Sequence, residues 1–310
     1  MDQPEAAPRH TLSQDIAHAA GRTVLVLGDI MFDRYVTGQV RRISPEAPIP
    51  VLRYAASRVV LGGAGNVANN VAALGARAIL IGTVGDDAFG RDPAGNGVAI
   101  PPTVDLRPVV LAGRPSTIKT RFMTGSHQLL RLDEESTDPF DDAATDALLA
   151  AYDTALAESD VVVLSDYAKG VLCDRVLAHA IAHARAAGRP VIADPKRPRF
   201  DAYRRVSVIT PNEHEIAQAT GIIVHDDAAA VAAGQAAIAA SDAEAILVTR
   251  SERGLTLVRG DAPPVHLPTE ARAVADVSGA GDTLVATFAV LLAAGADMVD
   301  AAVAANAAAG

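Results

Sequence analysis

The chain has one cysteine, no long apolar run and no excess of basic residues, and each absence excludes a class of protein. The single Cys173 rules out a disulfide within the chain. The longest apolar run, 284–296, is interrupted by Thr287 and is too short to span a bilayer. The net charge of −10 argues against a nucleic-acid or membrane-surface partner, for which a basic patch would be expected.

The N-terminal residues lack the apolar run of a secretory signal, because residues 1–20 mix Pro, Glu, Arg, His and Asp. We therefore expect a cytoplasmic protein with a polar leader at 1–22. The whole chain has 310 residues, half of them apolar, which is enough to bury a sizeable core. We expect one large domain over 23–310.

Apolar runs and helical patterns alternate along most of the sequence, and polar residues follow many of the runs. This alternation predicts an α/β fold with a mostly parallel sheet and helices on both faces. The predicted strands are 23–27, 77–83, 109–111, 161–164, 190–193, 206–209, 245–248 and 255–258. The predicted helices are one that follows the glycines of 62–65 and continues to 74, then 141–156, 171–187, 213–220, 228–240 and a last one from 284, whereas 90–108 is predicted to be a loop.

Two separated segments have a different pattern and predict a small β-sheet lid. Within 35–54, three prolines alternate with apolar residues, which favours short extended pieces and no helix. Within 117–133, two strand-like runs surround the turn Gly125-Ser126. We expect the lid to be formed from about 35–60 and 112–134.

A glycine-bearing turn, 276–282, runs directly into the last apolar helix. Gly279 and Gly281 let the backbone approach a ligand, and unpaired amides of a first helical turn hold anions. Asp282 would repel a bound anion, so its place there indicates a general base beside a transferring phosphoryl group. The alternative interpretation is ordinary helix capping. No Lys-Ser or Lys-Thr pair follows the glycines, so the turn is not a Walker A loop.

A second glycine-rich helix start and several polar strand ends predict a shared cleft. Gly62 and Gly63 precede a helix on which Asn66 and Asn70 share one face, suited to sugar hydroxyls, although tight packing explains glycines equally well. The polar strand ends can bind ligands or merely cap the next helix. They are Asp29, Ser165-Asp166-Tyr167, Asp194-Pro195-Lys196, Asn212-Glu213-His214-Glu215 and Thr249-Arg250-Ser251. Asn212 and Glu215 offer oxygen ligands for Mg²⁺ on nucleotide phosphates.

These motifs carry a resemblance to a known family. The turn 276–282 and Gly62-Gly63 with Asn66 resemble the signatures of the ribokinase-like (PfkB-type) carbohydrate kinases. Further stretches are similar to D-glycero-β-D-manno-heptose-7-phosphate kinases, which are cytoplasmic enzymes of ADP-heptose synthesis for lipopolysaccharide. Those stretches are 28–35, 42–48, 128–133, 164–170 and 210–212. The resemblance covers 24–310 and implies a ribokinase-like three-layer sandwich with a small β-sheet lid.

The resemblance implies an activity, cofactors and a set of site residues. The reaction would be phosphorylation of the heptose 7-phosphate at the anomeric hydroxyl by ATP with Mg²⁺, in a homodimer formed through the lid. Asp282 would be the base, and Gly279, Ala280 and Gly281 would form the anion hole. The nucleotide and its Mg²⁺ would lie at Asn212, Glu213, His214, Glu215, Thr249 and Ser251, with Glu215 at the metal. The sugar would lie at Asp33, Arg34, Gly62, Gly63, Asn66 and Lys196.

Three questions stay open from the sequence. The substrate phosphate needs a local cation, for which the candidates are Lys196, Arg34, Arg41, Arg42 and Arg121, although each can equally be a solvated charge. The chain ends where similar proteins continue, so we expect the C-terminal end of the domain to be missing. The alternative functions are another PfkB-type kinase, acting on a fructose phosphate or ribose, and a non-catalytic sugar- or nucleotide-sensing protein.

Overall fold

A computed structural model describes residues 19–260, 262–269 and 279–309. Most of the predicted polar leader, residues 1–18, and the first three residues of the glycine-bearing turn, 276–278, lie outside the described residues. Among the described helices, none is both long and apolar enough to cross a bilayer.

The centre of the molecule is a mostly parallel sheet, to which the described residues contribute nine strands. Their order is β15 (Ala262–Leu267), β14 (Leu255–Arg259), β13 (Ala245–Thr249), β12 (Val208–Ile209), β11 (Val191–Asp194), β10 (Val161–Ser165), β1 (Thr23–Gly28), β4 (Arg77–Ile81) and β6 (Val104–Leu106). Only the pairs β13–β14 and β14–β15 are antiparallel. Strands β1 and β10 are buried along their whole length, as expected of continuous apolar runs between two layers of helices.

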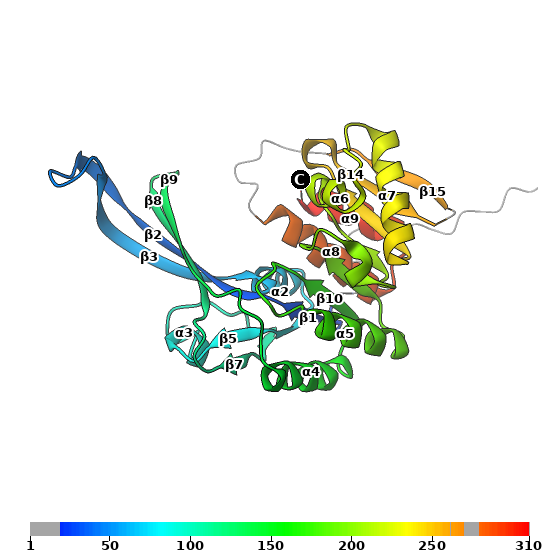
Figure 1. Cartoon of the computed structure of the whole chain (residues 1–310), viewed down its shortest axis with the longest axis horizontal. Helices are drawn as coiled ribbons and strands as arrows, with labels where there is room; N and C mark the ends of the chain where they lie inside the picture. Colours follow the sequence, from blue (N-terminus) through cyan, green and yellow to red (C-terminus); the bar gives the residue numbers. More distant parts are fainter. Residues whose placement is uncertain (1–18, 261, 270–278, 310) are drawn as a thin grey trace, which may run out of the picture.

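Helices cover both faces of this sheet, so the fold has three layers (Figure 1). Alternate residues of β1 show the division, since Val24 and Val26 belong to one core and Leu25 and Leu27 to the other. The first core includes α2 (Ala64–Ala73), α8 (Ala280–Ala294) and α9 (Met298–Ala309). The second includes α4 (Asp142–Leu156), α5 (Asp174–Ala186), α6 (Glu213–Thr220) and α7 (Asp227–Ser241). The predicted three-layer α/β architecture is confirmed.

The predicted lid is a four-stranded sheet that extends away from the three layers in Figure 1. Its order is β3 (Pro50–Gly63), β2 (Ile30–Ile43), β8 (Thr117–Thr124) and β9 (His127–Glu134). The expectation of short extended pieces was wrong, because β2 and β3 form one hairpin of 14-residue strands. Pro45 and Pro48 lie in its turn and Pro50 begins β3, so no proline removes a hydrogen bond from the middle of the ladder.

Other short elements were missed or placed wrongly. The predicted loop 90–108 contains the end of a one-turn helix, α3 (Ala88–Arg91), and the edge strand β6, whose three residues are too few for a periodic signal. Strand β7 (Val109–Leu111) was predicted, and it pairs with the unpredicted β5 (Thr83–Gly85). Strand β15 contains Pro263 and Pro264, which argue against a strand but are tolerated at a sheet edge. Helix α9 was not predicted.

Candidate active site

The carboxyl ends of the parallel strands meet the lid at a cavity of about 930 Å³. Parallel strands end at one edge, so the polar residues that follow them come together there. From the strand ends the cavity receives Tyr167, Asp194, Asn212 and Thr249. From the other elements it receives side chains of the lid, the start of α2 and the start of α8. The shared cleft that the sequence predicts is therefore present.

Asp282 is held at the start of α8 by two donors from distant segments. Asn66 Nδ2 donates to its Oδ2 at 2.6 Å, and the Tyr167 hydroxyl donates to its Oδ1 at 2.7 Å. The helix cap is Gly279, which has no side chain to cap the helix, and the Asp282 carboxylate accepts hydrogen bonds from these two side chains. The helix-capping interpretation of Asp282 is therefore not supported, and its carboxylate lines the cavity.

Glycine is required where the site's backbone segments approach closely. Gly279 has a φ of +92°, and a Cβ there would lie 3.1 Å from Asn66 Nδ2, which binds Asp282. A Cβ on Gly62 would lie only 2.1 Å from Asp33 Oδ2. The two glycine-rich turns thus let α8, α2 and strand β2 come together around the cavity, and Gly62 itself does not line it.

Three carboxylates line the sheet side of the cavity, those of Asp194, Glu215 and Asp282. Burial raises the pKa of Asp282 above its ordinary value, against the lowering effect of hydrogen bonds from Asn66 and Tyr167. Burial also raises the pKa of Asp194 well above its usual range, and the charges of Asp282 and Glu215 raise it further. Carboxylates placed so close in a buried site can bind a divalent cation, which would relieve their repulsion.

The predicted nucleotide residues divide into two groups. Asn212 and Glu215 form a reciprocal capping box at the start of α6, with bonds of 2.9 and 3.0 Å, and both line the cavity. Thr249 and Ser251 line it as well. Glu213 and His214 do not line the cavity, because they lie on another side of α6. Glu213 forms an ion pair with Arg253, and His214 binds Gln218 at 3.0 Å.

The predicted sugar residues also divide, because strand side chains alternate between faces. Asp33 lies on the cavity face of the lid and forms a 2.5 Å ion pair with Arg121. Arg34, the next residue, lies on the opposite face, where it binds Thr120 and Glu134 at 2.9 and 3.2 Å. The structure thus gives no support for a direct contact between Arg34 and a ligand in the cavity.

Lys196 is likewise placed outside the cavity lining. The sequence suggested an unpaired cation, but Lys196 Nζ lies 3.1 Å from Glu215 Oε1. Of the remaining candidate cations, Arg41 and Arg42 are exposed near the end of the β2–β3 hairpin, whereas Arg121 lines the cavity. Lys119 and Arg131 join Arg121 on the cavity face, since Arg121 pairs in register with Arg131.

Sequence reasoning assigned no role to Tyr167, although it named the residue among the polar strand ends. Burial raises the pKa of its hydroxyl, which therefore stays protonated and donates to Asp282. The loop that carries Tyr167 is fixed by Asp29, whose carboxylate accepts the backbone N–H groups of Tyr167, Lys169 and Val171 at 2.9, 3.1 and 3.1 Å. The sequence shows that Tyr167 is a polar residue after a buried strand. It does not show that Asp282 is its hydrogen-bond partner.

Comparisons with known proteins show the family to which the chain belongs. The family model described as pfkB family carbohydrate kinase matches residues 22–310. The chain is 52% identical over 292 residues to the "Bifunctional protein HldE" of Caulobacter vibrioides, covering 94% of this chain and 60% of the relative. It is 50% identical over 287 residues to the protein of the same name from Azorhizobium caulinodans, covering 92% and 60%. The chain thus spans about three fifths of the length of these curated relatives.

Solved structures show the same fold at low identity. Arabidopsis thaliana ribokinase complexed with ribose and ATP has a TM-score of 0.66 and 22% identity, over 94% of this chain and 91% of that one. Phosphofructokinase-2 from Escherichia coli, in complex with substrates and products, has a TM-score of 0.69 and 18% identity, over 91% and 89%. Similarity at this level of identity establishes the architecture of the chain.

Proposed function

From the premise that this chain belongs to the pfkB family of carbohydrate kinases, and so is a phosphotransferase that uses ATP, we propose its substrate. The substrate is D-glycero-β-D-manno-heptose 7-phosphate, and the product is the 1,7-bisphosphate, in ADP-heptose synthesis for lipopolysaccharide. The sequence resemblance at 42–48 and 164–170 supports this choice, as does the identity of about one half to proteins named HldE. We also propose a cytoplasmic location.

The observation that carries the proposal is the position of the Asp282 carboxylate in the first turn of α8, where the side chains of Asn66 and Tyr167 donate hydrogen bonds to it. Asp282 accepts the proton of the anomeric hydroxyl as the oxygen attacks the γ-phosphorus of ATP. A new P–O bond forms to the sugar while the bond between the γ-phosphorus and the β,γ-bridging oxygen breaks. ADP leaves with the electron pair of that bond.

The start of α8 would stabilise the charge that develops on the transferring group. The backbone amides of Ala280 and Gly281 lie in the first helical turn, where N–H groups have no partner within the helix, and Gly279 gives them room. Amides already fixed in this position need no reorganisation during the reaction. This is the anion hole that the resemblance implied.

The nucleotide would occupy the part of the cavity lined by Asn212, Thr249 and Ser251. Asp194 and Glu215 fit a Mg²⁺ ion, because both line one cavity and because burial, together with the charges of Asp282 and Glu215, raises the pKa of Asp194. Mg²⁺ bound there would neutralise charge on the β- and γ-phosphates. Glu213 and His214 would act only by completing the first turn of α6.

The sugar would lie between the lid and Asp282. Asp33, Gly63 and Asn66 line this side of the cavity. Asn66 would orient the Asp282 carboxylate as well as contact the sugar. Gly62 contributes because it has no Cβ, which leaves room for the carboxylate of Asp33. Lys196 would support the site through Glu215, whereas Arg34 faces away from the cavity and pairs with Glu134.

The proposed substrate is tested by measuring ATP turnover by this chain against a panel of sugars and sugar phosphates. We expect the heptose 7-phosphate to give the highest kcat/KM, ahead of fructose 6-phosphate, ribose and unphosphorylated heptose. Preference for a different sugar would retain the kinase and reject the heptose assignment.

Tyr167→Phe is expected to move the acid side of the pH–rate profile to higher pH. The active form of Asp282 is the carboxylate, so turnover falls as the pH falls through its raised pKa. Removing the hydroxyl removes a hydrogen bond that favours the carboxylate, which should raise that pKa further. Tyr203→Phe is a suitable control, because its hydroxyl binds Asp166 instead. A lower kcat with an unshifted profile would indicate a packing role only.

The lid is also the proposed dimer interface. Leu130 and Leu132 lie on the face opposite Arg121, where they are 60% and 47% exposed, and small sheets bury such a face against a partner. We expect a dimer in solution at micromolar concentration and a monomer for Leu130→Asp, measured by light scattering. Ile223→Asp, at a 77% exposed position outside the lid, should remain dimeric. A monomeric but active wild-type chain would reject the interface.

A further inference from the structure

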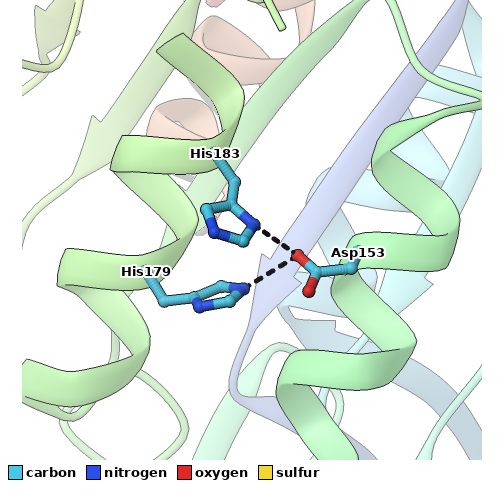
Figure 2. Close-up of side chains that lie close together, drawn as sticks. All are labelled: Asp153, His179 and His183. Carbon is cyan, nitrogen blue, oxygen red and sulfur yellow. Dashed lines mark hydrogen bonds and ion pairs between the residues drawn. The ribbon is translucent and has the colours of Figure 1, made fainter. Parts of the chain in front are cut away.

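Helices α4 and α5 carry three side chains with metal-binding atoms on the side of the sheet away from α8 (Figure 2). His179 and His183 are four residues apart on α5, so their rings share one face of the helix. Asp153 faces them from α4. Its Oδ1 lies 2.8 Å from His179 Nε2 and 2.9 Å from His183 Nδ1. Two imidazoles therefore converge on one carboxylate oxygen, and neither ring has a role in the proposed reaction.

The spacing of these atoms suits a metal ion. The three ligand atoms lie within 4.8 Å of one another. A tetrahedral ion with bonds of about 2.0–2.2 Å needs its ligand atoms roughly 3.4 Å apart. The two Oδ1–N separations of 2.8 and 2.9 Å are roughly half an ångström shorter than that spacing. In Figure 2 the second carboxylate oxygen of Asp153 makes none of the interactions drawn.

The two helices are fixed relative to each other beneath this cluster. Tyr152, next to Asp153, is fully buried, and its hydroxyl donates to the backbone oxygen of Ala180 at 2.8 Å. The Tyr152 ring also meets the His179 ring edge-on at 6.3 Å. The backbones that carry the three ligands are therefore already in place before an ion binds. Side-chain exposures of 24% for His179 and 48% for His183 leave a route for entry.

We propose that Asp153, His179 and His183 bind a divalent transition-metal ion, Zn²⁺, which links α4 to α5. Imidazole nitrogen with one carboxylate suits Zn²⁺, whereas Mg²⁺ prefers oxygen ligands and retains several waters. The site is therefore chemically distinct from the Mg²⁺ site proposed in the cavity. Three protein ligands leave a fourth position for water.

The test is a Zn²⁺ titration of the untagged chain in excess Mg²⁺, which occupies the carboxylates of the cavity. We expect one Zn²⁺ ion per chain at this site. Removing a group that only supports a metal ligand typically lowers metal affinity by about 10–100-fold. Because His179 and His183 are themselves proposed ligands, His179→Gln and His183→Gln should lower Zn²⁺ affinity at least as much. Glutamine keeps a side-chain donor for Asp153, so the helix contact is retained.

His225→Gln is the matched control. His225 also contacts an aspartate, Asp226, at 3.4 Å, but it is 74% exposed and is outside the cluster. Zn²⁺ should raise the unfolding temperature of the wild type and of His225→Gln, but not of His179→Gln or His183→Gln. Turnover should be equal in all four proteins. The proposal is overturned if the wild type binds no Zn²⁺, or if the His179 and His183 variants bind it as tightly as the wild type.

Discussion

Asp282→Asn is expected to lower kcat by about two to four orders of magnitude, the usual contribution of a general base, while leaving ATP affinity nearly unchanged. Asparagine has almost the same shape: its amide oxygen can accept from Asn66 Nδ2 while its NH₂ group donates to the Tyr167 hydroxyl oxygen. It cannot accept the substrate proton. The change therefore removes the proposed chemistry with little disturbance of the fold.

Asp226→Asn is the control for effects of a carboxylate at a helix start. Asp226 caps α7 by accepting the backbone N–H of Ala229, and asparagine caps a helix equally well. Its turnover should match that of the wild type. Single-turnover kinetics and ATP binding by calorimetry would separate the chemical step from binding. A folded Asp282→Asn enzyme with near-normal turnover would reject Asp282 as the base.

Arg121→Gln is expected to raise KM for the phosphorylated sugar about ten- to hundredfold, because a hydrogen bond to a charged group contributes about 1.5–3 kcal/mol. Arg121 lines the cavity from the centre of the lid, beside Lys119 and Arg131. Its planar fork suits a phosphate, which would compete with Asp33 for it. Glutamine retains a donor toward Asp33 and removes the positive charge.

Arg34→Gln is the matched control, since Arg34 is on the same lid but points away from the cavity to Glu134. It should change KM for the sugar phosphate by less than about threefold, as expected for a surface ion pair. ATP binding should be unaffected in both variants. The assignment of Arg121 fails if Arg121→Gln binds the phosphorylated sugar normally, or if the wild type turns over unphosphorylated heptose equally well.

Much of the architecture followed from local patterns. The buried strands β1, β10 and β13 were recognisable as continuous apolar runs between turn residues, and α6 was predicted to its exact bounds of Glu213–Thr220. Strand β6 and helix α9 were missed for different reasons. Three residues after a pair of prolines carry no periodic signal, and the alanine-rich α9 has no clear apolar face to distinguish it.

The sequence predicted the two glycine-bearing turns of the candidate site, but it did not predict which side chains contact each other there. Glycines before a helix predict close backbone approach whatever the fold, so Gly62, Gly279 and the carboxylate of Asp282 were identifiable from sequence. The donors to Asp282 were not, since Asn66 and Tyr167 lie 216 and 115 residues away in the chain. Only the sheet order, which places β1 beside β10 and α2 beside α8, brings these residues together.

The sequence by itself determined most of the buried strands and helices, and which two turns can approach an anion, because those properties depend on side-chain period and on backbone freedom. The tertiary structure decided which charged side chains enter the cavity. On one pleated strand Asp33 faces inward and Arg34 outward, and Arg121 is inward only because β8 pairs with β2 in this register. A shift of one residue would exchange the two faces, so the choice of cation depends on strand pairing rather than on composition.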